Sequence, residues 1–167
     1  TRHMTPDTCR TLTIVIPAFN EALRLPPNVG KIADWAAGQP RAVDILLVDD
    51  GSTDGSAGLA REALADRLPL TVLRNEPNRG KGFSVRRGML EATGDCVLFT
   101  DADLSTPIAE ADRLLAAMDA GADIAIGSRG MHESHVEIHQ PWWREKAGKL
   151  FGFLTRVRLQ LAAHELL

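Results

Sequence analysis

Short apolar runs alternate with longer stretches of helical periodicity through most of this chain. The runs are rich in β-branched residues and end at turn-forming residues, which is typical of buried strands. We expect strands at residues 11–16, 43–48, 70–73, 96–99 and 123–126. The intervening stretches predict helices with one apolar face, starting near Pro26, at Thr53 or Asp54, after Gly82 and at Pro107. This order predicts an α/β fold, with a mostly parallel sheet and helices on both faces.

The regular alternation ends after Arg129. Residues 131–140 are polar and contain three histidines, which we interpret as a solvated loop rather than a metal site. Residues 141–162 have apolar residues at helical spacing and an excess of Lys and Arg, so they predict a basic amphipathic helix. This helix either lies on an anionic membrane surface, with Trp142 and Trp143 at the interface, or packs on the sheet.

Length and composition fit one globular domain. The chain has 167 residues, 44% of them hydrophobic and 25% charged. Its net charge of −3 gives no indication of a nucleic-acid partner. We interpret residues 1–4 as a tag remnant and residues 11–130 as the core. No apolar run reaches the ~18 residues that a membrane span needs.

Two cysteines, Cys9 and Cys96, are too few for a disulfide or metal framework. Cys96 falls within an apolar run, where we expect it to be a small buried side chain. Unpaired cysteines favour a reducing, cytoplasmic location.

Asp101 and Asp103 follow the predicted strand at residues 96–99. Parallel strands present ligand-binding groups at their carboxyl ends, and residues i and i+2 of an extended chain point to the same side. Two carboxylates held this close require a proton or a cation between them. Mg²⁺ or Mn²⁺ shared with a diphosphate is the natural candidate. The alternative interpretation is that Asp103 only caps the following helix.

Other strand ends carry polar groups whose roles stay open at this point. Asp50 could accept hydrogen bonds from a base or ribose, or it could belong to an ordinary capped turn. Residues 78–82 include Lys81 and could bind phosphate, or they could form a solvated basic turn. Glu21 suits a helix N-terminus, and Arg129 suits a diphosphate or the solvent.

Five segments together resemble the family 2 glycosyltransferases, which have the GT-A fold. They are Ile-Pro-Ala-Phe-Asn-Glu at 16–21, Val-Asp-Asp-Gly-Ser-Thr-Asp-Gly at 48–55, Asn-Arg-Gly-Lys-Gly at 78–82, Asp-Ala-Asp-Leu-Ser-Thr-Pro at 101–107 and Ile-Gly-Ser-Arg at 126–129. The resemblance covers residues 12–154. Within the family, the chain resembles the dolichyl- or polyprenyl-phosphate β-glucosyltransferase branch, because Ser105 and Thr106 stand where mannose synthases carry Gln-His.

This resemblance implies an inverting, metal-dependent enzyme that uses Mg²⁺ or Mn²⁺. It would move glucose from UDP-glucose to a polyprenyl or dolichyl phosphate, at the cytoplasmic face of a membrane. The alternatives are a soluble acceptor, GDP-mannose as the donor, or a truncated nucleotide-binding domain without turnover. The family branch continues into an acceptor-side segment like Asp-Thr-Gln-Cys-Gly-Phe-Lys, where residues 159–167 have a different sequence. We therefore expect the acceptor half of the site to be missing.

The resemblance also assigns roles to single residues. It implies that the donor is bound by Pro17, Phe19, Glu21, Asp50, Lys81, Asp101, Ala102, Asp103, Arg129 and Arg144. Among these, Asp101 and Asp103 are the implied metal ligands, and together with Arg129 they are the implied catalytic residues. Arg129 and Arg144 match positions that clamp phosphates of the donor or the acceptor.

Overall fold

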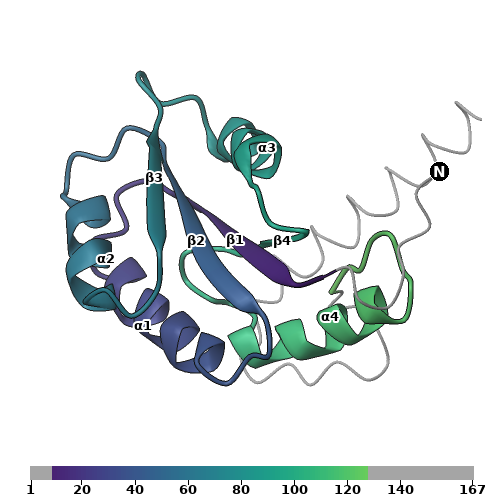
Figure 1. The fold of residues 1–167 in the computed structure, drawn as a ribbon. Coiled ribbons are helices and arrows are strands. Elements are labelled where there is room, and N and C mark those ends of the chain that lie inside the picture. The colour runs from purple at the N-terminus through teal and green to yellow at the C-terminus, as the bar shows by residue number, and fades with distance from the viewer. Residues whose placement is uncertain (1–8, 128–167) are drawn as a thin grey trace, which may run out of the picture. The chain divides into compact units, whose positions relative to one another are not determined.

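The four strands of the described chain form one parallel sheet in the order β3–β2–β1–β4. The structure is a computed structural model that describes residues 9–127. The strands are β1 (Thr11–Ala18), β2 (Ala42–Asp49), β3 (Leu70–Arg74) and β4 (Cys96–Phe99). The helices are α1 (Leu25–Ala36), α2 (Ser56–Leu64), α3 (Lys81–Glu91) and α4 (Ala111–Asp119), with a 3₁₀ turn η1 (Ile108–Glu110) before α4. Helices α1, α2 and α4 lie on one face of the sheet and α3 lies on the other, as predicted (Figure 1).

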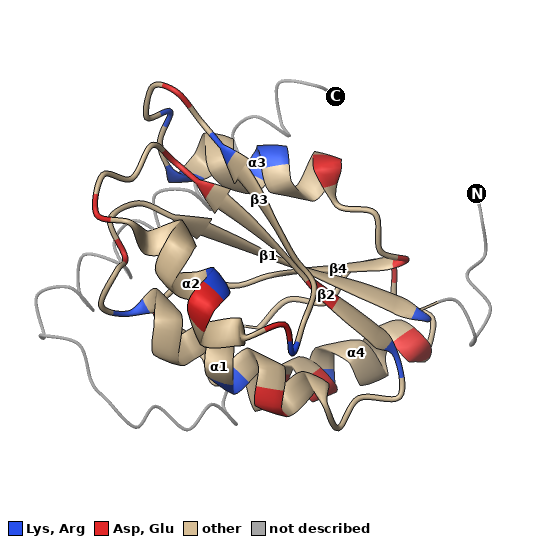
Figure 2. Cartoon of the chain, turned by 60° about the vertical axis from the view of Figure 1, so that its left-hand side comes forward, with Lys and Arg blue, Asp and Glu red and all other residues tan. Residues whose placement is uncertain are grey.

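Side-chain alternation divides the core between the two faces of the sheet. Ile14 and Ile16 of β1 belong to the cluster that packs with α1 and α2, whereas Val15 belongs to a smaller cluster with Leu46 and Val48. Figure 2 shows charged residues mainly in loops and on helix surfaces, while the strands are largely uncharged. The sheet is therefore apolar on both faces, which explains the nearly continuous apolar runs in the sequence.

Gly88 allows α3 to approach the sheet closely. A methyl group at this position would lie 2.3 Å from Cγ1 of Val15 and 3.0 Å from Cγ2 of Val48. No other residue type fits between the helix and these two valines without movement of one of them. The sequence therefore places a glycine where the helix must touch the sheet.

Strand β1 continues through Pro17, two residues beyond the predicted end. The amide N–H of Asp50 donates to the Ala18 carbonyl on the β2 side, and the N–H of Thr100 donates to the Val15 carbonyl on the β4 side. The backbone of Pro17 faces the same side as that of Val15, where pairing with β4 has already ended. The missing N–H of proline therefore costs no ladder hydrogen bond.

Three predicted features are wrong in detail. Residues 123–126 form no strand, and Ile124 and Ile126 are 77% and 78% exposed, because no strand of the described part pairs with them. Pro107 precedes η1, so α4 starts later than predicted. The N-cap of α2 is Gly55 in a left-handed conformation, rather than Thr53 or Asp54.

Cys9 and Cys96 form a disulfide, so the expectation of unpaired cysteines is wrong. Cys9 lies just before β1 and Cys96 opens β4, and these parallel neighbours start at the same edge of the sheet. Their Cα atoms are 5.4 Å apart, within bonding reach, although 87 residues separate them in sequence. The reducing location inferred from unpaired cysteines loses its basis.

Several expectations concern residues outside the described range. They are the tag remnant at 1–4, Arg129, the loop at 131–140, the helix at 141–162 with Trp142 and Trp143, and Arg144. These remain predictions. Within residues 9–127, no helix is both long enough and apolar enough to cross a bilayer.

Candidate functional site

A cleft of about 230 Å³ opens at the carboxyl ends of β1, β2 and β4. It brings together every candidate site residue of the described range: Pro17, Phe19, Glu21, Asp50, Lys81, Asp101, Ala102 and Asp103. The strand ends that carry these residues are far apart in sequence and meet because the strands are parallel neighbours. Ala18, Arg24 and Ser84 complete the lining and were missed by sequence reasoning.

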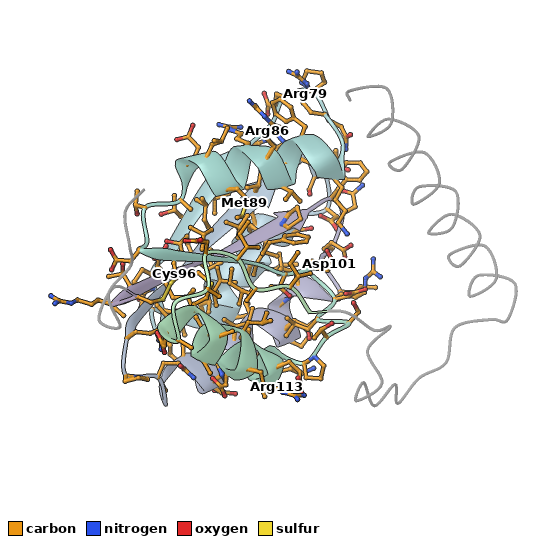
Figure 3. The ribbon with its side chains drawn as sticks, turned by 90° about the vertical axis from the view of Figure 1, so that its right-hand side faces the viewer. Arg79, Arg86, Met89, Cys96, Asp101 and Arg113 are labelled. Carbon is orange, nitrogen blue, oxygen red and sulfur yellow. A yellow bond between two sulfur atoms is a disulfide. The ribbon has the colours of Figure 1, made fainter. Side chains whose placement is uncertain are left out.

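The two carboxylates of the Asp-Ala-Asp motif are presented on a turn and not on extended chain. The N–H of Leu104 donates to the Asp101 carbonyl at 3.1 Å, and Leu104 has a φ of +46°. The N–H of Ser105 donates to Oδ1 of Asp103 at 3.0 Å. Ala102 is buried in the core between them. The expectation that Asp101 and Asp103 share one side of an extended chain is therefore wrong, yet both acids line the same cleft. In Figure 3, Cys96 marks the start of β4, and Asp101 lies beyond the other end of this strand.

Asp101 has a cationic neighbour at one of its oxygens. Oδ1 of Asp101 is shielded from solvent and accepts no hydrogen bond from the described residues. The ammonium of Lys81 lies 2.7 Å from this oxygen, and it also lies 5.9 Å from the centre of the Phe99 ring. The positive charge beside this oxygen shows that the position accommodates a cation.

The described residues fit a divalent cation that is shared with a bound phosphate group. No cluster of three or more His, Cys, Asp or Glu residues in this part of the chain could hold a metal alone. Asp101 and Asp103 supply hard oxygen ligands, which Mg²⁺ and Mn²⁺ prefer. Mg²⁺ is commonly bound by one or two carboxylates together with substrate phosphates. The remaining ligands would therefore come from the substrate.

Asp50 holds the loop between β3 and α3. Its carboxylate accepts hydrogen bonds from Nδ2 of Asn75 at 2.8 Å, from the N–H of Arg79 at 3.0 Å and from the N–H of Gly80 at 2.7 Å. Burial raises the pKa of Asp50, but the hydrogen bonds led by those from Arg79 and Asn75 outweigh burial and lower it. Asp50 is thus ionised, and hydrogen bonds from the loop and from α3 occupy most of its lone pairs.

The loop after β1 is fastened to the loop after β2 by side chains. Oγ of Ser52 accepts from the N–H of Asn20 at 3.0 Å, and Oγ of Ser56 accepts from the N–H of Glu21 at 2.8 Å. Oδ2 of Asp54 accepts from the N–H of Ala22 at 2.9 Å. Much of the Asp-Gly-Ser-Thr-Asp-Gly motif is therefore used to hold the neighbouring wall of the cleft.

Arg24 and Ser84 are the polar residues that sequence reasoning missed. Arg24 makes a two-point ion pair with Glu21, with nitrogen–oxygen distances of 2.7 and 2.8 Å. The i, i+3 spacing of these two residues was the available signal. Ser84 lies in the first turn of α3, and its hydroxyl accepts from Nδ2 of Asn75 at 3.0 Å. A serine on an apolar helix face gave no comparable signal.

A family model described as "Glycosyl transferase family 2" matches residues 13–164, most of the chain. This chain belongs to the family 2 glycosyltransferases. The predicted family and its GT-A fold are therefore confirmed, whereas the glucosyltransferase branch is not.

Relatives of this family 2 glycosyltransferase include two curated lipid-phosphate mannosyltransferases. A polyprenol monophosphomannose synthase of Mycolicibacterium smegmatis is 39% identical over 163 residues, which are 95% of this chain and 59% of the relative. A dolichol-phosphate mannosyltransferase of Pyrococcus furiosus is 35% identical over 148 residues, 89% of this chain and 41% of the relative. The chain thus spans about half the length of these curated relatives.

A solved structure is also similar to this chain. It is the mannosyltransferase PcManGT from Pyrobaculum calidifontis, in complex with GDP-Man and Mn²⁺. The TM-score is 0.51 at 28% identity, over 59% of this chain and 29% of that one.

Proposed function

We propose that this family 2 glycosyltransferase transfers mannose from GDP-mannose to a polyprenyl phosphate. The observation that carries the proposal is the 39% identity, over 95% of the chain, to a polyprenol monophosphomannose synthase. The cleft supports it, because two carboxylates and a lysine meet at the carboxyl edge of the sheet. The relatives give no support for UDP-glucose as the donor and fit the alternative, GDP-mannose, better.

In this proposal, each wall of the cleft binds one part of the donor. Pro17 and Phe19 flank the nucleoside, and Asp50 lines the cleft on the side of the base and the ribose. Asp101 and Asp103 hold Mg²⁺ or Mn²⁺. When bound, the metal neutralises charge that develops on the departing diphosphate. Lys81 leaves Asp101 for a diphosphate oxygen, where its positive charge also stabilises the leaving group.

The acceptor needs positioning rather than activation. The oxygen of a lipid phosphate is already anionic at neutral pH, so no general base has to remove a proton from it. The acceptor lies in a membrane, and we therefore propose that the enzyme works at a membrane surface. Arg129 and Arg144 remain the predicted phosphate contacts for this step.

The test is a calorimetric titration of the 167-residue chain with GDP-mannose and with UDP-glucose, each with Mn²⁺. We expect GDP-mannose to bind at least ten-fold tighter than UDP-glucose. Asp103→Asn, which keeps the size of the side chain, should weaken the Mn²⁺-dependent binding of GDP-mannose. Tighter binding of UDP-glucose would overturn the choice of donor. Radiolabelled mannose should enter the organic phase when polyprenyl phosphate is added, and labelled product confined to the aqueous phase would overturn the lipid acceptor.

A further inference from the structure

The turn that carries the Asp-Ala-Asp motif is held at its middle by a residue of α1. Nδ2 of Asn28 donates a hydrogen bond of 2.9 Å to the carbonyl oxygen of Ala102. Asn28 is 7% exposed, so this contact is buried. Nζ of Lys31, one turn further along α1, donates to Oδ1 of Asn28 at 3.1 Å. This second bond orients the amide with its donor toward Ala102.

Ala102 and Leu104 pack against the core, but the turn's own hydrogen bonds are local. Leu104 is a β-turn residue with positive φ, a conformation that costs free energy for any residue except glycine. The bond from the Leu104 N–H to Asp101 and the bond from the Ser105 N–H to Asp103 both lie within the turn. Asn28 adds a hydrogen bond from outside the turn, and it does so between the two carboxylates.

We propose that Asn28 is a positioning residue, which fixes the spacing of Asp101 and Asp103 for the metal–diphosphate group. The inference rests on the proposed function, because it concerns the metal site of that function. Outer-shell groups orient metal ligands, and the loss of one commonly weakens metal binding about 10- to 100-fold. Asn28 acts on Asp101 and Asp103 through the backbone carbonyl between them. Asn28 also joins the turn to α1, which begins beside Glu21 and Arg24 on the nucleoside side of the cleft.

The test compares Asn28→Asp and Asn28→Ala with Val29→Ala in the full chain. Asn28→Asp keeps the shape of the side chain and removes the donor. Val29 is the next residue of α1 and is fully buried, so Val29→Ala destabilises the helix packing and keeps the Asn28 side chain that bonds to Ala102. Binding of Mn²⁺ in the presence of GDP is followed by the electron paramagnetic resonance of free Mn²⁺, and GDP binding without metal is followed by calorimetry.

We expect both Asn28 variants to bind Mn²⁺ about 10- to 100-fold more weakly with GDP present, and to bind GDP without metal within two-fold of the wild type. Val29→Ala should match the wild type in both measurements. The proposal is overturned if the folded Asn28 variants keep wild-type Mn²⁺ affinity, or if Val29→Ala loses as much.

Hydrogen exchange gives a readout that needs neither metal nor nucleotide. In both Asn28 variants, the amides of Leu104 and Ser105 should exchange faster, while those of β1 stay protected. Unchanged exchange at these two amides would also overturn the proposal. If the wild type bound neither GDP nor Mn²⁺, the proposed function would fail, whereas the exchange measurement would still test the role of Asn28 in holding the turn.

Discussion

Gly88→Ala is the substitution for which the fold predicts the least intuitive result. Alanine in place of glycine inside a helix normally stabilises it by about 1 kcal/mol. Gly88 lies in α3, where the added methyl would be 2.3 Å from Cγ1 of Val15. Real Cβ atoms essentially never come within 3.0 Å of such a neighbour, so the helix or the strand must move.

The expected loss follows from two opposing effects. Forcing an extra methyl group into a packed core costs roughly 1–3 kcal/mol, and the severe overlap with the stiff side chain of Val15 points to the upper part of that range. The gain in helix propensity offsets about 1 kcal/mol of this cost. We therefore expect the free energy of unfolding to fall by about 1–2 kcal/mol.

Gly82→Ala is the matched control in the same helix. No heavy atom lies within 4 Å of a methyl group built at this position, and its φ is not in the left-handed region. We expect Gly82→Ala to leave stability unchanged or to raise it by up to about 1 kcal/mol. Urea unfolding followed by circular dichroism, with the midpoint and the slope fitted for each variant, measures both changes.

A double variant with Val15→Ala identifies the cause. Removal of the Val15 methyl groups opens the space that the new methyl needs, so the two losses should be less than additive by about 1 kcal/mol or more. Equal stabilisation by Gly88→Ala and Gly82→Ala would refute the close approach of α3 to the sheet. Strict additivity with Val15→Ala would refute Val15 as the obstacle.

Three further predictions concern the cleft. Asp103→Ala should abolish the metal-dependent part of nucleotide-sugar binding, measured by calorimetry with Mn²⁺ and with EDTA, and unchanged Mn²⁺ dependence would contradict its role as a ligand. Lys81→Met should raise the affinity for Mn²⁺ alone by about two- to five-fold, because Lys81 and Mn²⁺ compete for Asp101 and the substitution removes the exposed ion pair. Weaker Mn²⁺ binding by this variant would contradict the competition between Lys81 and the metal. Hydrogen bonds hold the pKa of Asp50 in the folded chain below its ordinary value of 3.8. The stabilising contribution of this carboxylate is therefore complete above that pH and disappears as the pH falls through the lower, folded pKa. The urea midpoint should therefore fall less between pH 6 and pH 3 in Asp50→Asn than in the wild type. An equal fall in both proteins would exclude this contribution.

Patterns along the chain predicted the sheet well because both of its faces are buried. The strand at 96–99 has the predicted limits. The observed β2 is longer than predicted by one residue at each end, and β3 is longer by one residue at its carboxyl end. Pro17 misled the prediction for β1, because a proline harms a strand only where its nitrogen faces a paired neighbour. The apolar run at 123–126 led to the prediction of a strand that the structure does not have, because apolar residues alone do not provide a partner strand.

The location of the cleft was predictable from the sequence. Which of its residues face a ligand and which hold the surrounding loops was not. Asp50 was expected to face a ligand, yet most of its lone pairs hold the loop at Arg79 and Gly80. Asn28 carried no signal, since an asparagine at the start of a helix is ordinary and its partner is 74 residues away. Contacts of this kind depend on which backbone groups the fold leaves unsatisfied, and short motifs do not record that.

The bonds between the loop at 19–22 and the loop at 52–56 have a consequence for engineering of this enzyme. Each of these segments presents backbone donors or side-chain acceptors that the other requires. A chimera that imports only the first segment from a relative with another donor preference would inherit mismatched acceptors and a poorly formed wall. Exchange of both segments as one cassette would keep the pairs intact, because this wall of the cleft is built by two loops together and not by a single motif.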